Sequence, residues 1–352
     1  MEAVKTYYCQ NCGAVMKFDV SSQNLKCPNC GNEIEIEHDE SKIVEHELTR
    51  EAIKSIKAEE KTSTSMECEG CGAIVEVDAT STATECPYCG AKYVLAKKQM
   101  DALVPDGVVP FKIDKVRVGE IYHDWIKSRW LAPNALKSLY QTDKLQGIYM
   151  PFWTFDADVE ASYHAMGGID RQVTYEDDEG ETHTRIETDW YPTSGHVHNF
   201  FDDVIVKASN KLKSNLLDSM VYNTQNISSF SPDYMSGYCS EIYTIDLDNA
   251  HTEARDKMQS TMRGLCESDV LRRYDRVRGL SMNAVYEDET YKHVLLPVYS
   301  TAYYYKDKVY HVLINGQSGV IVGEYPKSAV KIAAIVAVII IIIAIIVYFM
   351  NS

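Results

Sequence analysis

The chain has 352 residues, enough for two or three domains, and its 45% hydrophobic and 24% charged content is that of a folded protein rather than a disordered one. Its formal net charge of −16 divides into −6 for residues 1–99, where 11 Lys and Arg face 17 Asp and Glu, and −10 for the remainder, where 24 face 34. Neither part has the Lys and Arg excess of a protein that neutralises phosphates, so the composition argues against bulk nucleic-acid binding.

Eight of the ten cysteines fall into Cys-x-x-Cys pairs. The pairs are Cys9 and Cys12, Cys27 and Cys30, Cys68 and Cys71, and Cys86 and Cys89. Fourteen residues separate the first two pairs, and the last two repeat that spacing at an offset of 59. Residues 9–37 and 68–96 share ten of 29 aligned positions, which indicates an internal duplication. The chain opens MEAVKTYYCQ, without the features of a secretory signal, so the pairs indicate metal ligation rather than disulfides.

This spacing predicts two zinc ribbons, at 5–37 and 64–97. Four thiolates complete a tetrahedral shell around Zn²⁺, and the two-residue gap lets one tight turn supply two ligands. A glycine follows every pair and can adopt the left-handed backbone that closes such a turn. The segments AVMKFDV and AIVEVDA between the pairs alternate like short strands. We expect two structural zinc ions, with iron in four-thiolate geometry as the alternative, and no open coordination position for catalysis.

Each ribbon resembles the zinc ribbons of transcription-factor-IIB-type proteins and of the primosomal protein N-prime. The resemblance is carried by the cysteine pairs and implies a fold only. It does not imply helicase activity, because none of the eighteen glycines is followed by Lys and a phosphate-binding G-x-x-x-x-G-K-[ST] loop is therefore absent.

Residues 41–62, between the ribbons, predict a connecting helix. The apolar residues of SKIVEHELTREAIKSIKAEEK recur at helical intervals, and Ser41 is a candidate cap. We expect a solvated linker, with a partner-binding or self-associating helix as the alternative.

Residues 100–326 predict an α+β domain with an antiparallel sheet. Helices are expected over 114–131, around 203–221 and around 248–275; strands are expected over 152–164, 172–175 and 182–188. The last two strands flank an Asp-Asp-Glu-Gly turn, and the end of the domain predicts a three-stranded antiparallel meander.

Three phrases in this domain share an apolar-Pro-apolar entry to a strand, at 109–111, 147–153 and 295–299. Together with NGQSG and GEYPKS near the C-terminal end, they make the domain resemble that of a bacterial family of membrane-bound tandem zinc-ribbon proteins. The resemblance covers most of the chain. Neighbours of that family often include phage-shock and SPFH-domain proteins, which implies an adaptor role in a membrane-stress response.

The sequence gives little support for a catalytic function. The sequence lacks a nucleophile elbow, an HExxH motif and a dinucleotide fingerprint, so we expect no enzyme and no small-molecule substrate. One alternative is a metalloenzyme built around His196 and His198, two imidazoles on one strand face with Asp202 and Asp203 nearby. We favour the simpler interpretation that this pair lies in an exposed loop.

Residues 332–350 predict a transmembrane helix. The segment IAAIVAVIIIIIAIIVYFM has no charge, Pro or Gly. Its nineteen residues, at ~1.5 Å each, span about 28 Å, close to the ~30 Å hydrocarbon thickness. Lys327 and Lys331 precede it and nothing basic follows, so the positive-inside rule predicts a single-pass protein with its N-terminal domains in the cytoplasm.

Together these features predict a tail-anchored, zinc-binding adaptor or scaffold that recruits a cytosolic protein partner to the membrane. The alternative is a membrane-tethered nucleic-acid-binding ribbon protein, related to replication or transcription. The negative charge of residues 1–99 argues against that alternative.

Overall fold

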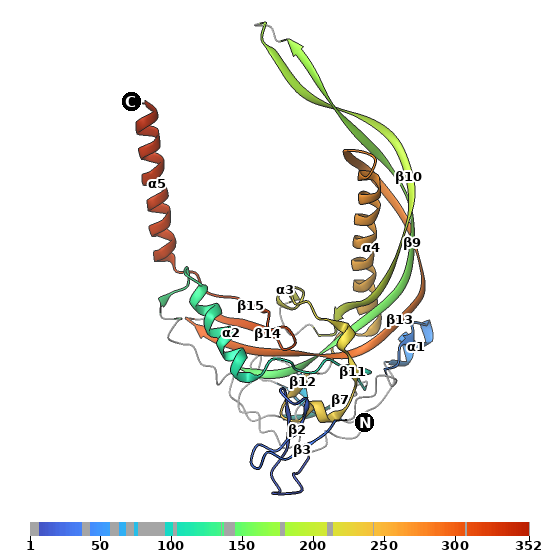
Figure 1. Cartoon of the computed structure of the whole chain (residues 1–352), viewed down its shortest axis with the longest axis vertical. Coiled ribbons are helices and arrows are strands. Elements are labelled where there is room, and N and C mark those ends of the chain that lie inside the picture. The colour runs from blue at the N-terminus through green and yellow to red at the C-terminus, as the bar shows by residue number, and fades with distance from the viewer. Residues whose placement is uncertain are drawn as a thin grey trace.

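Three very long antiparallel strands organise the computed structural model of the chain. They are β9 (Gln146–Glu176), β10 (Thr182–Lys207) and β13 (Arg276–Tyr305). β9 lies between the other two, and all three bend upward from a broad base into a protruding arm (Figure 1). The structure describes residues 7–36, 43–56, 63–67, 74–76, 96–100, 104–134, 136, 145–176, 180–209, 214–241, 243–306 and 308–351.

The arm consists of the far halves of the three strands and one helix, α4 (Leu247–Leu271), which lies along one face of the sheet (Figure 1). The Asp246 side chain caps α4 by accepting from the Asn249 backbone N–H. The buried stripe of α4 recurs at helical spacing: Leu247, Ala250, Ala254, Met258, Met262, Cys266 and Val270. Alternate β9 residues, among them Val159, Ala161 and Tyr163, pack against this stripe, so the opposite face of the sheet is left to solvent.

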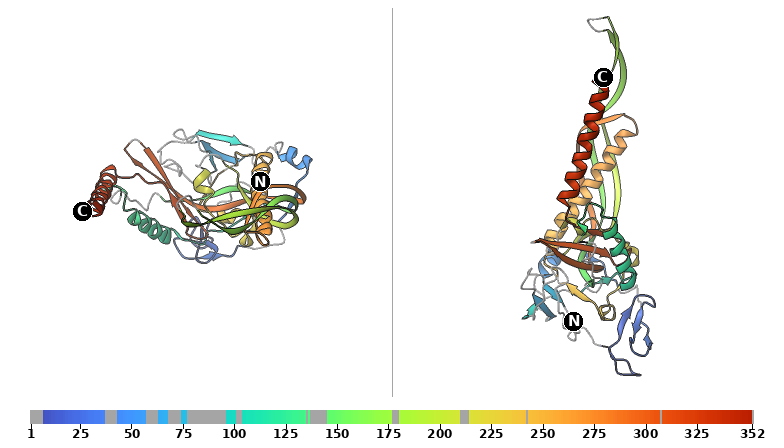
Figure 2. Two further views of the ribbon diagram at one scale, coloured as in Figure 1. Left: turned by 90° about the horizontal axis from the view of Figure 1, so that it is seen from above. Right: turned by 90° about the vertical axis from the view of Figure 1, so that its left-hand side faces the viewer.

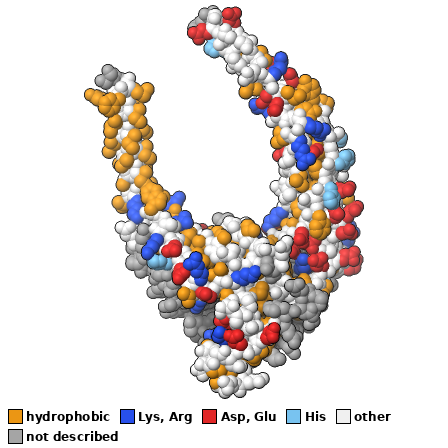
Figure 3. Space-filling view, viewed as in Figure 1, with side chains coloured by type: hydrophobic (Ala, Val, Ile, Leu, Met, Phe, Trp, Pro, Cys, Tyr) orange, Lys and Arg blue, Asp and Glu red, His pale blue; other side chains and the backbone are white. Residues whose placement is uncertain are grey.

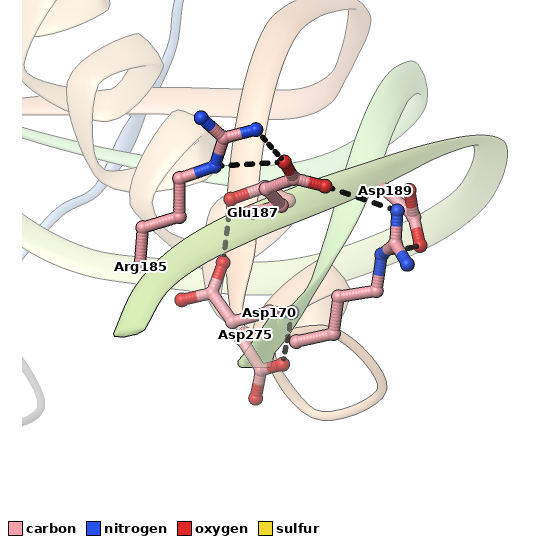
Figure 4. Close-up of polar contacts among 7 residues, drawn as sticks. Asp170, Arg185, Glu187, Asp189 and Asp275 are labelled. Carbon is pink, nitrogen blue, oxygen red and sulfur yellow. Dashed lines mark hydrogen bonds and ion pairs between the residues drawn. The ribbon is translucent and has the colours of Figure 1, made fainter. Parts of the chain in front are cut away.

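Beyond Gly168, where β13 begins, β9 and β10 continue as a two-stranded ribbon. Its surface is mixed, because Ile169, Tyr175 and Ile186 are exposed beside several ion pairs. Arg185 lies 2.6 Å from Glu187, and Arg171 bridges Glu187 and Asp189 at 3.0 Å each (Figure 4). The charged side chains of this ribbon favour water over hydrocarbon.

The base brings together the three apolar-Pro-apolar phrases of the sequence. Pro151 of β9 pairs with Leu295 of β13, and the Val109 N–H donates to the Leu295 carbonyl at 2.9 Å. Phe111 stacks on Tyr238 with ring centroids 4.2 Å apart. A Cβ on Gly147 would lie 2.5 Å from the Tyr238 ring, so this glycine is required for close packing.

Shorter elements complete the base. They are β4 (His46–Glu47), α1 (Arg50–Ser55), β5 (Ser63–Glu67), β6 (Ile74–Glu76), β7 (Ala96–Met100), β8 (Gly107–Val108), α2 (Lys115–Ser128), α3 (Ser214–Leu217), η5 (Thr224–Asn226), β11 (Ser228–Ser229), η6 (Pro232–Met235), β12 (Cys239–Glu241), β14 (Lys308–Asn315) and β15 (Ile321–Gly323). β13, β14 and β15 form the predicted antiparallel meander. α2, capped by Asp114, confirms the first predicted helix of this domain, and α4 confirms the last.

The first ribbon segment forms a separate three-stranded sheet of β1 (Lys17–Asp19), β2 (Asn24–Lys26) and β3 (Glu33–Ile34). It lies at the lower end of the base in Figure 1. The sheet is docked on the base, because the Phe18 N–H donates to the Ser236 carbonyl at 3.0 Å and the Ser236 hydroxyl donates to the Met16 carbonyl at 2.7 Å. The Phe18 ring meets Tyr234 edge-on at 5.4 Å.

The C-terminal helix α5 (Ala329–Asn351) leaves the opposite side of the base, the side from which the arm also rises (Figures 1 and 2). Over 329–350 it is long and apolar enough to cross a membrane, and its most apolar stretch is unburied (Figure 3). Its first turn is fixed to the base, since the Lys331 ammonium donates to the carbonyls of Trp130 and Ala132 at 2.9 and 2.7 Å.

Two of the predicted helices were wrong. The expected helix over 41–62 is interrupted: in the described residues 43–56, β4 pairs with β13, and only α1, capped by Thr49, is α-helical. β4 forms backbone pairs with β13, and this tertiary contact overrides the helix propensity of the segment. The helix expected around 203–221 is mostly strand or short turn, because Val204, Ile205 and Val206 continue β10 in register with β9. Only α3 is helical in the described part of that segment.

Candidate metal centre

Four cysteines of the first ribbon converge on one point. The sulfur atoms of Cys9, Cys12, Cys27 and Cys30 all lie within 4.8 Å of one another. Two separations across the pairs are shorter: 3.5 Å from Cys9 Sγ to Cys30 Sγ, and 3.4 Å from Cys12 Sγ to Cys27 Sγ. Four thiolates at the Zn–S distance of ~2.3 Å stand about 3.8 Å apart in a tetrahedron, so the cluster has the size that a metal ion requires.

Each pair of ligands is delivered by the same tight turn. In the first, the Gly13 N–H donates to the Cys9 carbonyl at 2.8 Å, and the Cys9 N–H donates to the Ala14 carbonyl at 2.8 Å. In the second, the Gly31 N–H donates to the Cys27 carbonyl at 2.9 Å. Both glycines have positive φ, +74° and +75°. Any other residue would be strained there, which explains the glycine after each pair.

The backbone of these turns also favours thiolate at the two buried cysteines. N–H groups of Cys30 and Asn29 point at the Cys27 sulfur and lower its pKa to about 6. Burial opposes ionisation of Cys9, but N–H groups from its own turn outweigh burial and leave its pKa below the ordinary value. Thiolates are the form that binds metal, and soft sulfur donors select zinc or iron over magnesium or calcium. The donor set therefore fits a structural metal ion.

The sequence predicted that these four cysteines come together; that they hold a metal ion stays a prediction. The second predicted set, Cys68, Cys71, Cys86 and Cys89, lies outside the described residues and stays a prediction. The flanking strands β5, β6 and β7 join the large sheet through β6, which pairs with β12.

His196 and His198 lie in β10, so their favoured placement in a loop was wrong. Both side chains are exposed on the face of the sheet opposite α4. His198 contacts the Asp158 carboxylate of β9 through Nε2. The predicted neighbours Asp202 and Asp203 belong instead to a carboxylate group with Asp156.

Lys292 provides the positive charge beside these carboxylates, a contact that the sequence analysis did not predict. The Lys292 ammonium lies 2.8 Å from Asp203 Oδ1, 3.6 Å from Asp156 Oδ2 and 2.9 Å from Glu45 Oε1. Burial would lower the pKa of Lys292, but the ion pairs with Asp203 and Glu45 outweigh burial and raise it. A β-bulge at Asp203, with φ +54°, directs its N–H to Asp156 at 2.6 Å. We therefore assign no metal to these carboxylates.

His293, next in the chain, is a buried neutral imidazole. It is 3% exposed and lies against the Trp153 and Tyr243 rings, with centroids 4.9 and 5.5 Å away. Burial lowers its pKa to about 4. Because an unfolded histidine titrates near pH 6.5, the unfolded chain binds this proton first as the pH falls, and about 3 kcal/mol of stability is lost between pH ~6.5 and ~4.

We expect His293→Leu to remove that part of the pH dependence. Unfolding free energies of the detergent-solubilised chain, measured from pH 4.5 to 7, should fall less steeply for the variant than for the wild type. His123, whose side chain is 42% exposed, supplies the matched control substitution His123→Leu. Equal slopes in all three proteins would contradict a buried neutral His293.

Comparison with known proteins gives one relative along nearly the whole chain. The chain is 29% identical over 338 residues to "Uncharacterized protein YdjG" of Bacillus subtilis (strain 168), covering 94% of this chain and 92% of that protein. No protein-family model and no solved structure matches. The similarity is therefore not confined to the cysteine-rich segment and extends through the base and the arm.

Proposed function

We propose that this protein is a membrane-anchored zinc-ribbon adaptor that holds a protein partner at the cytoplasmic face of a bilayer. The observation that carries the proposal is the placement of its two ends. The sheet of β1, β2 and β3 that bears the four-cysteine group lies at the end of the base opposite the side from which α5 departs (Figure 1). When α5 is inserted, the ribbon is held away from the lipid.

Zinc in both ribbons and a cytoplasmic orientation are parts of this proposal. The repeated spacing supports a second four-thiolate site like the first. Lys327 and Lys331 at the start of α5 support the orientation through the positive-inside rule. The whole-length similarity to the Bacillus protein supports one architecture that includes ribbon, base, arm and anchor.

The surface of the first ribbon supports a protein partner rather than a nucleic acid. Residues 7–36 hold two Lys against three acidic residues, and Lys26 is already paired with Glu33 at 2.7 Å. Phosphate recognition needs a local excess of cations, which this surface lacks. Both metal-binding turns are exposed, and Tyr8 beside the first is 60% exposed, a residue type enriched in protein interfaces.

The arm limits how the anchor inserts. α5 and the arm rise from the same side of the base, and the ion-paired end of the arm is incompatible with hydrocarbon. In a flat bilayer α5 must therefore run at a wider angle to the arm than in Figure 1. Ser328 and Lys331 are hydrogen-bonded to the base, so this change of angle must break those contacts or bend α5 beyond Lys331.

A photo-crosslinker placed at exposed Asn29 tests the proposal. In cells, the full chain should crosslink one protein species that fractionates with membranes. A chain ending at residue 328 should crosslink the same species in the soluble fraction. Addition of Cys27→Ala should abolish the crosslink, because the turn that presents residue 29 needs its metal.

Exposed Arg50 of α1, away from the ribbon, is the matched position for the crosslinker and should not yield that species. Crosslinks to nucleic acid at residue 29, or a partner that stays on membranes when α5 is deleted, would contradict recruitment by this chain.

A further inference from the structure

We propose a surface site for a divalent transition metal on the solvent face of the arm, formed by His196, His198 and Glu160. It is distinct from the four-cysteine group and does not depend on the adaptor function. Its donors are imidazole and carboxylate, the set that suits Zn²⁺, Ni²⁺ or Cu²⁺ at an exposed position.

The strand register places the donors together. His196 and His198 are two residues apart in β10, so both side chains point to the same face. Across the ladder, His198 is directly opposite Glu160 of β9, and His196 is opposite Ser162. Directly opposed side chains in antiparallel strands have Cβ atoms only about 5 Å apart.

A shallow cavity of about 260 Å³ lies over these positions. It is lined by Glu160, Ala161, Ser162, His196, Val197, His198 and Val285. Val285 enters from β13, so all three strands of the arm contribute. A space of this size has room for an ion with its waters, while the open side leaves coordination positions for a second ligand.

Asp158 orients His198 as a metal ligand. Its carboxylate contacts His198 Nε2. A carboxylate accepts a hydrogen bond from that nitrogen, and in this tautomer Nδ1 keeps its lone pair for a metal ion. Metal-bound histidines typically donate their other ring N–H to a carboxylate in this way, and the contact raises ligand basicity. Asp158 is therefore a positioning residue rather than a ligand.

The local charge also favours a cation. Glu287 of β13 lies opposite Asp158, so carboxylates from two strands border the site. Figure 3 shows histidine and acidic side chains gathered along the outer flank of the arm. In the described structure His196, His198 and Glu160 are not among the residue groups whose ligand atoms all lie within 4.8 Å of one another. Binding thus requires rotation of the exposed His196 and Glu160 side chains, while His198 keeps its contact with Asp158.

Titration of the zinc-replete full chain with further Zn²⁺ tests the site by calorimetry. We expect one additional equivalent beyond the metal held by the cysteine thiols. His196→Asn with His198→Asn should remove that equivalent while leaving the thiol-bound zinc unchanged. Asp158→Asn should weaken it about tenfold, as loss of a carboxylate behind a histidine ligand does elsewhere. His183→Asn, on the same strand but outside the cavity, should leave it unchanged.

Cobalt provides an independent readout. Co²⁺ added to the zinc-replete chain should give d–d absorption without the sulfur-to-cobalt charge-transfer band of a thiolate site, and the double variant should lose that absorption. The proposal is overturned if the wild type takes up no additional equivalent, or if the double variant keeps it.

Discussion

Replacing Cys27 with alanine should remove the metal from the first ribbon and unfold residues 7–36. Structural zinc contributes roughly 10–16 kcal/mol of binding free energy in small zinc domains, and most of it is lost with one of four ligands. Three strands of two or three residues cannot compensate, because so small a sheet buries too little apolar surface. We expect one metal equivalent fewer, and amide exchange over the ribbon at the rate of an unfolded chain.

The effect should extend to the base. The ribbon contributes Met16, Phe18 and Leu25 to the apolar cluster that also contains Tyr234 and Phe111. Unfolding of the ribbon uncovers Tyr234 and breaks the two hydrogen bonds to Ser236, so η6 should also lose amide protection.

Cys266→Ala is the matched control for Cys27. Cys266 is fully buried on α4 and lies outside the four-cysteine group. Its loss should reduce stability modestly by leaving a small cavity, with metal content unchanged. A Cys27→Ala protein that keeps its full complement of metal and its ribbon protection would show that these sulfurs do not hold an ion.

The elements that local sequence determines were predicted well. Cysteine spacing and the following glycines identified the first four-cysteine group, and the Asp114 cap with its apolar stripe identified α2. A long unbroken apolar run identified α5. In each case the signal lies within a few turns of chain, where periodicity and capping are informative.

The hairpin at the end of the arm was predicted by its two strands, but the length of the arm was not, because pairing between distant segments determines it. Gly167 and Gly168 suggest a turn in the sequence, yet both lie inside β9. A Cβ on Gly167 would lie 2.3 Å from the Tyr274 ring, and one on Gly168 would lie 2.5 Å from Thr188 Cγ2. These glycines therefore make room for neighbouring side chains rather than turning the chain, a purpose that one segment alone cannot reveal.

The contact of His198 with Asp158 and the ion pairs of Lys292 were also not predicted, because their members are far apart in the sequence. His198 and Asp158 are 40 residues apart, and Lys292 is paired with carboxylates from β9, β10 and the segment before β4. Sequence reasoning grouped the histidines with Asp202 and Asp203 because they are neighbours in the chain. A one-residue bulge at Asp203 turns that carboxylate toward Lys292 instead.

Lys292→Met should destabilise the chain by about 3–5 kcal/mol, the cost of leaving buried carboxylates without their cation. The side chains of Lys292, Asp156 and Asp203 are only 6, 7 and 9% exposed, so water cannot replace the ammonium. The loss should appear as a lower unfolding free energy and as faster amide exchange where β10 and β13 flank the cluster. Lys257→Met, which removes a 40% exposed ammonium bonded to the Ile205 carbonyl, should cost well under half as much.

Two further measurements separate loss of charge from loss of packing in Lys292→Met. Burial already raises the pKa of Asp156, and removal of the ammonium should raise it further. A raised carboxyl pKa favours the protonated folded form, so the deficit relative to wild type should shrink as the pH falls from 7 toward 5. Adding Asp203→Asn to Lys292→Met should recover part of the loss, because one buried charge is removed. A deficit that is constant with pH and unrelieved by the second substitution would mean that Lys292 acts through its methylenes rather than its charge.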